Sequence, residues 1–295
     1  MRAIAVLRFI WQHPANRRCR FRAVRQAVSW QGYKRITKKP YDLHLWDGMM
    51  LRCYPDSASA SLALYCAGRP DWHEMAFMAR YLRPGDGFVD VGANVGVYTL
   101  FARSLIGAAG RLEAFEPGAK ASQRLRENLA LNGVTDQVRV HACAVGAESG
   151  VVRFTNSQDA TNAIVTESTE SPADSIEMPC ARLDDVLTGQ YAMGKMDIEG
   201  AEPLALQGAE HMLAAQNPPV WLLEVNGACQ RYGWSEEELA AWLGQRGYDL
   251  ALYDADLGTL DYGPRPWLRQ PNVLAIAQSA RSNVTDRLRQ APVHR

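Results

Sequence analysis

The run FVDVGANVGVYTL at residues 88–100 constrains the fold more than any other part of the chain. It opens with an apolar stretch typical of a buried strand, passes Gly92 and Gly96, and continues with apolar residues at helical spacing. Glycines at such a turn let the backbone bend sharply and approach a ligand closely. The run therefore predicts a strand, a tight turn and a helix, the repeating unit of a parallel sheet covered by helices.

The same alternation continues along the chain and predicts seven strands. They are expected at residues 87–91, 111–115, 138–142, 195–198, 220–225, 248–253 and 272–277. The link between the last two is punctuated by Asp, Gly and Pro, which argues against a helical crossover and favours antiparallel pairing. We expect a Rossmann-like α/β fold: a seven-stranded, mostly parallel sheet with an antiparallel last hairpin, helices on both faces and an N-terminal appendage.

Three segments lie outside this alternation. Residues 1–80 are expected to form a basic appendage, helical at first and with short strands near residues 43–54. Within the core at 81–278, an insertion at 147–180 contains a strand at 151–154 and a polar stretch at 155–175, either a hairpin or lid, or a solvated surface loop. The polar tail at 279–295 is expected to be flexible.

Charge is distributed very unevenly along this formally neutral chain. Residues 1–41 carry eleven Lys or Arg and no acid, so of the 32 basic and 32 acidic residues in total the remainder holds 21 and 32. The basic segment also carries apolar residues at helical spacing, which favours peripheral contact with an anionic membrane or docking of an anionic glycan. The competing interpretation is that it folds back onto the acidic core and reduces the repulsion there.

The cysteines and the first apolar stretch indicate the compartment. Six scattered cysteines without a CxxC pair, and without histidines at metal-ligand spacing, argue against a zinc site and a disulfide framework. Residues 3–11 are apolar but too short to span a membrane, and they lack a signal-peptide cleavage site. A cytoplasmic protein is expected, in peripheral contact with a membrane if the basic segment binds one.

An acid at the end of the next strand identifies the ligand expected at the glycine turn. Glu116 lies 24 residues after Gly92, where a carboxylate accepts hydrogen bonds from the two hydroxyls of a ribose. The glycines follow GxxxG spacing, whereas a dinucleotide site uses GxGxxG. Asp90 adds a negative charge that suits a sulfonium or ammonium group better than a phosphate. These features favour S-adenosylmethionine.

Three sequence blocks resemble the FkbM family of class I S-adenosylmethionine-dependent methyltransferases. They are DVGANVG at 90–96, FEPGAKASQRLRENLALNG at 115–133 and KMDIEGAEPLALQGAEHML at 195–213, the last preceded by LDDVL at 183–187. The resemblance covers residues 80–225, about half of the chain, and implies the family's seven-stranded sheet with a reversed last hairpin.

The resemblance also implies roles for individual residues. The methionine end of the cofactor is expected at Gly92, Ala93, Asn94 and Gly96, with Asp90 nearby. The ribose is expected at Glu116, with Pro117 shaping the rim. Asn94 stands where the wider class has a glycine, and residues 143–146 lack the acid that commonly follows the third strand, which leaves adenine recognition unassigned.

The motif MDIEGAE supplies the candidate reaction centre. Asp197 and Glu199 alternate at the end of the fourth strand and are the predicted catalytic residues; Glu202 begins the next helix, where acids also act as caps. A hydroxyl acceptor needs a base within reach, or a divalent cation held by Asp197 and Glu199 with Glu224 nearby, but no metal site is assigned. His73 and Asn226 are further candidates for the edge of the cleft.

The expected function is methyl transfer to a hydroxyl of a sugar, glycan or secondary metabolite. N-methylation and a non-catalytic S-adenosylmethionine-binding module are the alternatives. Nucleic acid is not expected as a substrate, because the core is acidic and lacks an Asn/Asp-Pro-Pro-Tyr/Phe motif of the kind that holds a flipped base.

Overall fold

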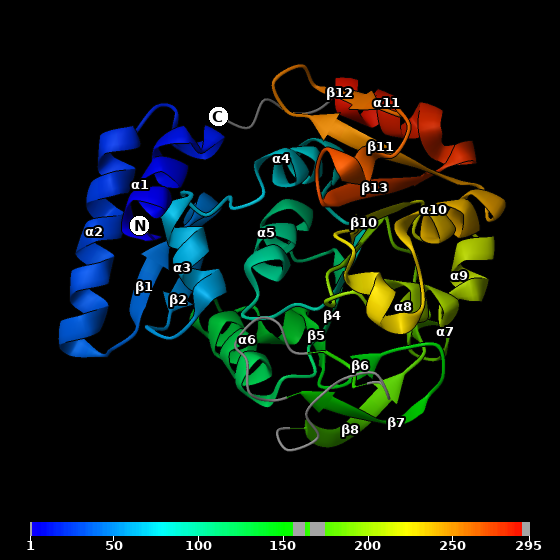
Figure 1. The fold of residues 1–295 in the computed structure, drawn as a ribbon, viewed down its shortest axis with the longest axis horizontal. Helices are drawn as coiled ribbons and strands as arrows, with labels where there is room; N and C mark the ends of the chain where they lie inside the picture. The colour runs from blue at the N-terminus through cyan, green and yellow to red at the C-terminus, as the bar shows by residue number, and fades with distance from the viewer. Residues whose placement is uncertain (1, 156–162, 166–174, 291–295) are drawn as a thin grey trace.

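A computed structural model describes residues 2–155, 163–165 and 175–290 (Figure 1). Its centre is a sheet in the order β12-β11-β13-β10-β9-β3-β4-β5. The strands are β3 (Gly87–Val91), β4 (Arg111–Phe115), β5 (Arg139–His141), β9 (Met193–Met196), β10 (Val220–Glu224), β11 (Tyr248–Asp254), β12 (Thr259–Asp261) and β13 (Asn272–Ala277).

The pairing confirms the predicted fold class. β5, β4, β3, β9 and β10 are parallel, whereas β13 is antiparallel to both β10 and β11. The eighth strand, β12, was not predicted: it is three residues long and pairs with β11 at the sheet edge. The fourth strand, β9, ends at Met196, whereas the sequence predicts that it continues to Ile198. Asp197 and Ile198 therefore lie in the loop that follows the strand.

Helices cover the two faces of the sheet (Figure 1). One face carries α4 (Trp72–Tyr81), α5 (Val97–Ile106) and α6 (Ala119–Leu131); the other carries α7 (Leu183–Val186), α8 (Glu202–Gln207), α9 (Glu210–Ala214) and α10 (Glu236–Gln245). Alternate residues of a strand enter different apolar clusters, as Phe88 and Val89 do. A strand buried on both faces is why β3 reads as an apolar run.

The N-terminal segment packs on the first of these faces. It consists of α1 (Arg2–Gln12), α2 (Arg20–Thr37), the hairpin of β1 (Tyr41–His44) and β2 (Met50–Cys53), and α3 (Ala58–Tyr65). Ile10 and Trp30 belong to the same buried cluster as Phe88, so apolar packing continues across residue 80. The buried Asn16 amide donates to the carbonyl oxygens of Ile10 and Tyr65 at 2.9 and 2.8 Å and fixes the turn between α1 and α2.

The insertion forms a second, smaller sheet. β6 (Ala144–Val145), β8 (Ser175–Ala181) and β7 (Gly150–Thr155) pair in that order, below the main sheet in Figure 1. β7 corresponds to the strand expected at 151–154. Most of the polar stretch at 155–175 lies outside the described residues, but Ala163–Val165 return to β7, where the Thr155 amide donates to the Ala163 carbonyl. No helix in the part of the chain described here has the length and apolarity needed to cross a membrane.

The expectation of a flexible tail is wrong for residues 281–289. They form α11 (Arg281–Arg289), which buries Val284 and Leu288 against the core. Arg287 donates to Asp86 at 2.6 Å and ties the helix to the loop that precedes β3. The two apolar residues recur at i and i+4, so the helix has a short apolar stripe within a polar sequence.

We predict that Leu288→Ala lowers the free energy of unfolding by about 2–3 kcal/mol, because it removes buried apolar contacts and leaves a cavity. Urea unfolding followed by circular dichroism measures this. Ser282→Ala, at an exposed position of the same helix, is the control and should change stability by less than about 0.5 kcal/mol. Equal stability of the two variants would mean that the helix does not dock on the core.

Candidate functional site

The glycine turn after β3 is closely packed on all sides. Gly92 and Gly96 have φ of +82° and +94°, and Asn94 has φ of +50°, all in the left-handed region. A Cβ atom on Gly92 would lie 2.1 Å from the Asp197 carbonyl oxygen, and one on Gly96 would lie 2.6 Å from Leu125 Cδ1. Gly92, Ala93 and Asn94 therefore present backbone to the space above β3, while Gly96 seats the turn against α6.

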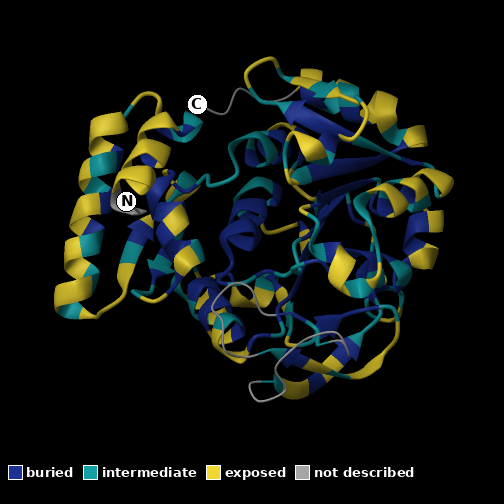
Figure 2. Ribbon diagram, viewed as in Figure 1, coloured by how far each residue is buried: buried dark blue, intermediate teal, exposed yellow. Residues whose placement is uncertain are grey.

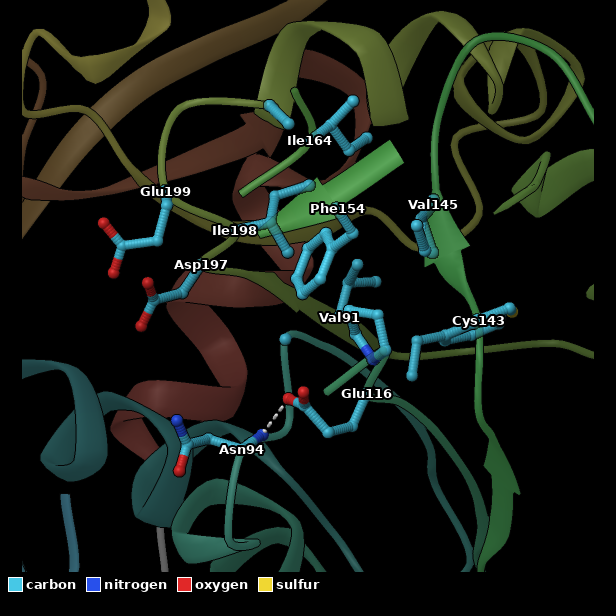
Figure 3. Close-up of a pocket in the computed structure, with 15 residues that line it drawn as sticks. Val91, Asn94, Glu116, Cys143, Val145, Phe154, Ile164, Asp197, Ile198 and Glu199 are labelled. Atoms are coloured by element: carbon cyan, nitrogen blue, oxygen red, sulfur yellow. Dashed lines mark hydrogen bonds between the residues drawn. The ribbon is translucent and has the colours of Figure 1, made fainter. Parts of the chain in front are cut away.

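The Glu116 carboxylate bridges two backbone segments beside this turn. It accepts the Asn94 amide at one oxygen and the Gly118 amide at the other, both at 2.7 Å (Figure 3). The side chain is 7% exposed, and burial raises its pKa to about 7 although both amide bonds act in the opposite direction. Each oxygen keeps a free lone pair, so the carboxylate is arranged to accept two further hydroxyl groups, such as those of a ribose.

A cavity with a largely apolar wall adjoins Glu116 and Pro117. Its wall is formed by Val91, Phe115, Cys143, Val145, Phe154 and Ile164, and we call it the apolar hollow. In Figure 3, Cys143 and Val145 lie on the opposite side of the pocket from Asp197 and Glu199, and Phe154 lies between the two sides. Residues 143–146 thus contribute apolar contacts in place of the acid whose absence the sequence shows, and such a wall suits a flat, weakly polar base.

A second cavity, which we call the charged hollow, continues from the first. It is lined by acids and a lysine that include Asp71, Lys195 and Glu224, and it shares four lining residues with the apolar hollow: Gly92, Asn94, Asp197 and Glu199. The two hollows together form one cleft at the carboxyl edge of β3, β4, β9 and β10. Ligands bind at this edge in open α/β sheets, near the point where strand order reverses.

Lys195 forms the floor of the charged hollow, and the buried Asp90 lies beneath it. Asp90 is completely buried; Thr99 donates to its Oδ2 at 2.6 Å, and its Oδ1 lies 3.9 Å from Lys195 Nζ without a hydrogen bond. Lys195 Nζ lies 3.2 Å from Asp197 Oδ2 and 4.8 Å from the centre of the Tyr98 ring. Burial alone would lower the Lys195 pKa, but Asp197 and Asp90 outweigh it and raise that pKa.

This geometry refines what the sequence predicts for the acids. Asp90 lies beneath the floor, so its charge acts on a ligand through Lys195 and the turn, with no direct exposure. Asp197 and Glu199 both line the cleft, and Glu199 has a φ of +58°, an uncommon conformation for a residue other than glycine. Glu202 is buried and accepts the Ile198 amide at 2.8 Å, which ties the first residue of α8 to the loop before it and does not cap the helix.

Two candidates for the cleft edge are placed elsewhere. His73 Nδ1 accepts the Ala255 amide at 3.1 Å, between α4 and β11. Asn226 is exposed and its side-chain oxygen accepts the Ala228 amide. Neither side chain lines the cleft: His73 joins α4 to the turn after β11, and Asn226 stabilises its own loop.

Two residues of the cleft were not predicted from the sequence to have a main role in the site: Lys195 and Glu224. Glu224 ends β10, beside Asp197 at the end of β9, and lines the charged hollow with Asn272. Its side chain has no hydrogen bond or ion pair to any residue that the structure describes. Burial, followed by the charges of Asp197, Glu202 and Glu199, raises its pKa to about 8. An acid at the end of a predicted strand can be recognised in the sequence. That its side chain has no partner becomes evident only in the folded structure.

A divalent cation is the other means by which such a cleft could activate an acceptor hydroxyl. Among the residues in the described ranges, no three His, Cys, Asp or Glu side chains are grouped so that they could hold a metal ion. Asp197 is instead paired with Lys195, which supplies the positive charge next to it.

Fold and site together define a class of protein. The reversed strand order, the glycine turn, the Glu116 carboxylate next to it and the charged hollow beside them are the features of a Rossmann-like S-adenosylmethionine-dependent methyltransferase. Gly92, Ala93, Asn94, Glu116 and Pro117 are the residues that would hold the cofactor.

The family follows from a family model described as the methyltransferase FkbM domain, which matches residues 90–250. This is more than half of the chain, so the chain belongs to the FkbM methyltransferase family. It is 45% identical over 80 residues to the 31-O-demethyl-FK506 methyltransferase FkbM of Streptomyces tacrolimicus, a match covering 27% of this chain and 30% of that protein. It is 27% identical over 197 residues to the methyltransferase sdnD of Sordaria araneosa, covering 55% and 73%.

Solved structures show more distant similarity. The methyltransferase FkbM from Methylobacillus flagellatus is 16% identical, with a TM-score of 0.45 over 86% of this chain and 59% of that one. An rRNA methylase from Streptococcus thermophilus is 15% identical, with a TM-score of 0.39 over 68% and 91%.

We predict that Glu116→Gln weakens S-adenosylmethionine binding by about tenfold or more, because an amide cannot accept hydrogen bonds at both of its ends. Isothermal titration measures the affinity. In the wild-type protein the affinity should rise with pH through about 7, where Glu116 ionises and both oxygens accept; in the variant this rise should be lost. Glu148→Gln, at an exposed position, is the control. An unchanged affinity for Glu116→Gln would remove Glu116 from the cofactor site.

Proposed function

We propose that the chain transfers a methyl group to a hydroxyl of a sugar, glycan or secondary metabolite. The observation that carries the proposal is an unpaired, half-buried acid, Glu224, in a hollow that adjoins the cofactor side of the cleft. The printed name of the Streptomyces relative, which refers to a 31-O-demethyl compound, agrees with an oxygen acceptor.

S-adenosylmethionine supplies an electrophilic methyl group that an acceptor oxygen displaces in line from sulfur, so alignment of the acceptor provides much of the acceleration. The chain has to hold the acceptor in the charged hollow and accept its proton. As the new oxygen–carbon bond forms and the carbon–sulfur bond breaks, the hydroxyl proton passes to a carboxylate within hydrogen-bond reach.

Glu224 is the acid best suited to accept that proton. A pKa of about 8 makes it a stronger base than an ordinary carboxylate and close to the working range of a cell. Asp197 is held in an ion pair with Lys195, so its carboxylate is already engaged with a partner, whereas that of Glu224 is not. Asp197 and Glu199 are the catalytic residues predicted from the sequence. In this proposal they contact the acceptor and position it, and both roles remain predictions.

A first experiment identifies the acceptor. The protein is incubated with methyl-labelled S-adenosylmethionine and a panel of sugars, glycosides, hydroxylated aglycones and amines, and products are detected by mass spectrometry. We expect label on oxygen. Label only on amine nitrogen would contradict the proposal in favour of N-methylation, and cofactor binding without any transfer across the panel would favour a non-catalytic binding module.

With the best acceptor of that panel, Glu224→Gln should lower kcat by about 100-fold, the size of a lost general base, without changing cofactor affinity. The rise of kcat with pH near 8 should disappear with it. Glu199→Gln tests the sequence-predicted residue in parallel, and Glu237→Gln, at an exposed position on α10, is the control. A Glu224→Gln enzyme with full kcat and an intact pH profile would exclude Glu224 as the proton acceptor.

Stability offers a test that needs no acceptor. Because the pKa of Glu224 is near 4.5 in the unfolded chain and about 8 in the folded one, its contribution to stability is complete below about 4.5 and is lost as pH rises through about 8. We expect Glu224→Gln to gain stability relative to wild type as pH is raised over this window, measured by urea unfolding. A pH-independent difference between the two proteins would show that Glu224 has an ordinary pKa.

A further inference from the structure

The hairpin of α1 and α2 exposes large apolar side chains that a folded core normally buries. Ile4, Phe21 and Ile36 are 75%, 81% and 84% exposed, and most of α1 lies open to solvent, as the yellow colour in Figure 2 shows. The hairpin is anchored to the rest of the chain by a few buried residues, namely Ile10, Ala23, Ala27 and Trp30. Its remaining apolar side chains are left on the outer surface.

The positive charges of this hairpin are also left without acidic partners. Ten of the eleven Lys and Arg in residues 1–41 have described side chains, and among them Arg17 alone forms an ion pair, with Asp256 at 2.6 Å. Neutralisation of the acidic core by this segment is therefore not what the structure shows. The segment attaches through apolar packing, and its guanidinium and ammonium groups face solvent.

Apolar and basic side chains alternate on one surface of the hairpin. On α2, Phe21, Arg25 and Val28 recur at i, i+4 and i+7 and so share a face. The Phe21 ring packs edge-on against Trp11 of α1 at 5.0 Å, and the Arg20 guanidinium lies 5.7 Å from the Trp11 ring centre. Aromatic and apolar side chains mixed with cations are the composition of helices that lie in the headgroup region of a bilayer.

This surface continues toward the cleft. A groove between α1 and α3 is lined mainly by apolar atoms, with Val6 and Phe9 on one side and Ser59 and Leu62 on the other. Ser59 and Leu62 also line the charged hollow. The groove therefore leads from the hairpin to the half of the cleft where an acceptor is expected to bind.

We propose that the α1–α2 hairpin binds the surface of an anionic lipid bilayer, with its apolar side chains among the acyl chains and its cations at the lipid phosphates. Charge complementarity selects this partner, because an uncharged apolar partner would leave nine solvent-facing cations unused. If the proposed methyl transfer also holds, the acceptor is an amphipathic molecule that enters from the membrane through the α1–α3 groove.

The test uses the full-length protein and sedimentation with vesicles of phosphatidylcholine alone, or of phosphatidylcholine mixed with phosphatidylglycerol. We expect binding to the mixed vesicles, weakened by salt, and little binding to phosphatidylcholine. The double variant Arg25→Gln/Arg35→Gln should weaken binding by about 25-fold, at about fivefold for each charge near the surface. Arg139→Gln/Arg265→Gln removes the same net charge from other exposed positions and should retain the affinity.

Phe21→Ser tests the apolar contribution and should also weaken binding, whereas Val151→Ser, at an exposed position on β7, should not. Circular dichroism confirms that each variant is folded. Equal binding to both kinds of vesicle, equal effects of the two arginine pairs, or tighter binding to a homopolymeric RNA than to anionic vesicles would each overturn the proposal. Because vesicle binding is measured without acceptor or turnover, failure of the methyl-transfer proposal leaves this result intact.

Discussion

The cleft depends on a single buried ammonium group. Lys195 lies in the central strand β9, paired in register with Asp90 of β3, and its Nζ reaches up to Asp197. Asp71, Glu199 and Glu224 add further carboxyl groups to the same hollow. Without a cation at its floor, this group of acids would be costly to bury, and removal of one partner from a buried pair leaves an uncompensated charge. Lys195 thus offsets part of the cost of burying Asp90 and pairs directly with Asp197, and it leaves Glu224, which is farther along the sheet edge, unpaired.

Those parts of the fold and the site that rest on short-range patterns were predictable from the sequence. The β3 strand, the Gly92 turn and the following helix are encoded by consecutive residues, and Glu116 follows at a spacing set by one strand–helix–strand unit. The antiparallel last hairpin was readable because its link is rich in Asp, Gly and Pro. In each of these cases the physical cause lies within about thirty residues of chain.

Features that depend on which strands become neighbours were not predictable in this way. Lys195 acquires its role only because β9 lies beside β3, and Glu224 becomes a cleft residue only because β10 follows β9. The helix α11 was missed for a different reason. Its sequence is polar, and the stripe formed by Val284 and Leu288 is just long enough to dock it, with the Arg287–Asp86 pair completing the contact. Local composition predicts a flexible tail for this segment, whereas packing against the core stabilises it as a helix.

The lining of the cleft divides according to position along the chain. Residues that face the expected cofactor lie between 90 and 200, inside the family domain, whereas Ser59, Leu62, Pro70 and Asp71 reach the charged hollow from the segment before it. The segment before the family domain thereby supplies one wall of the hollow in which the proposed acceptor would bind. If the proposed methyl transfer holds, divergence of the first eighty residues would alter this wall and leave the residues expected to hold the methyl donor unchanged.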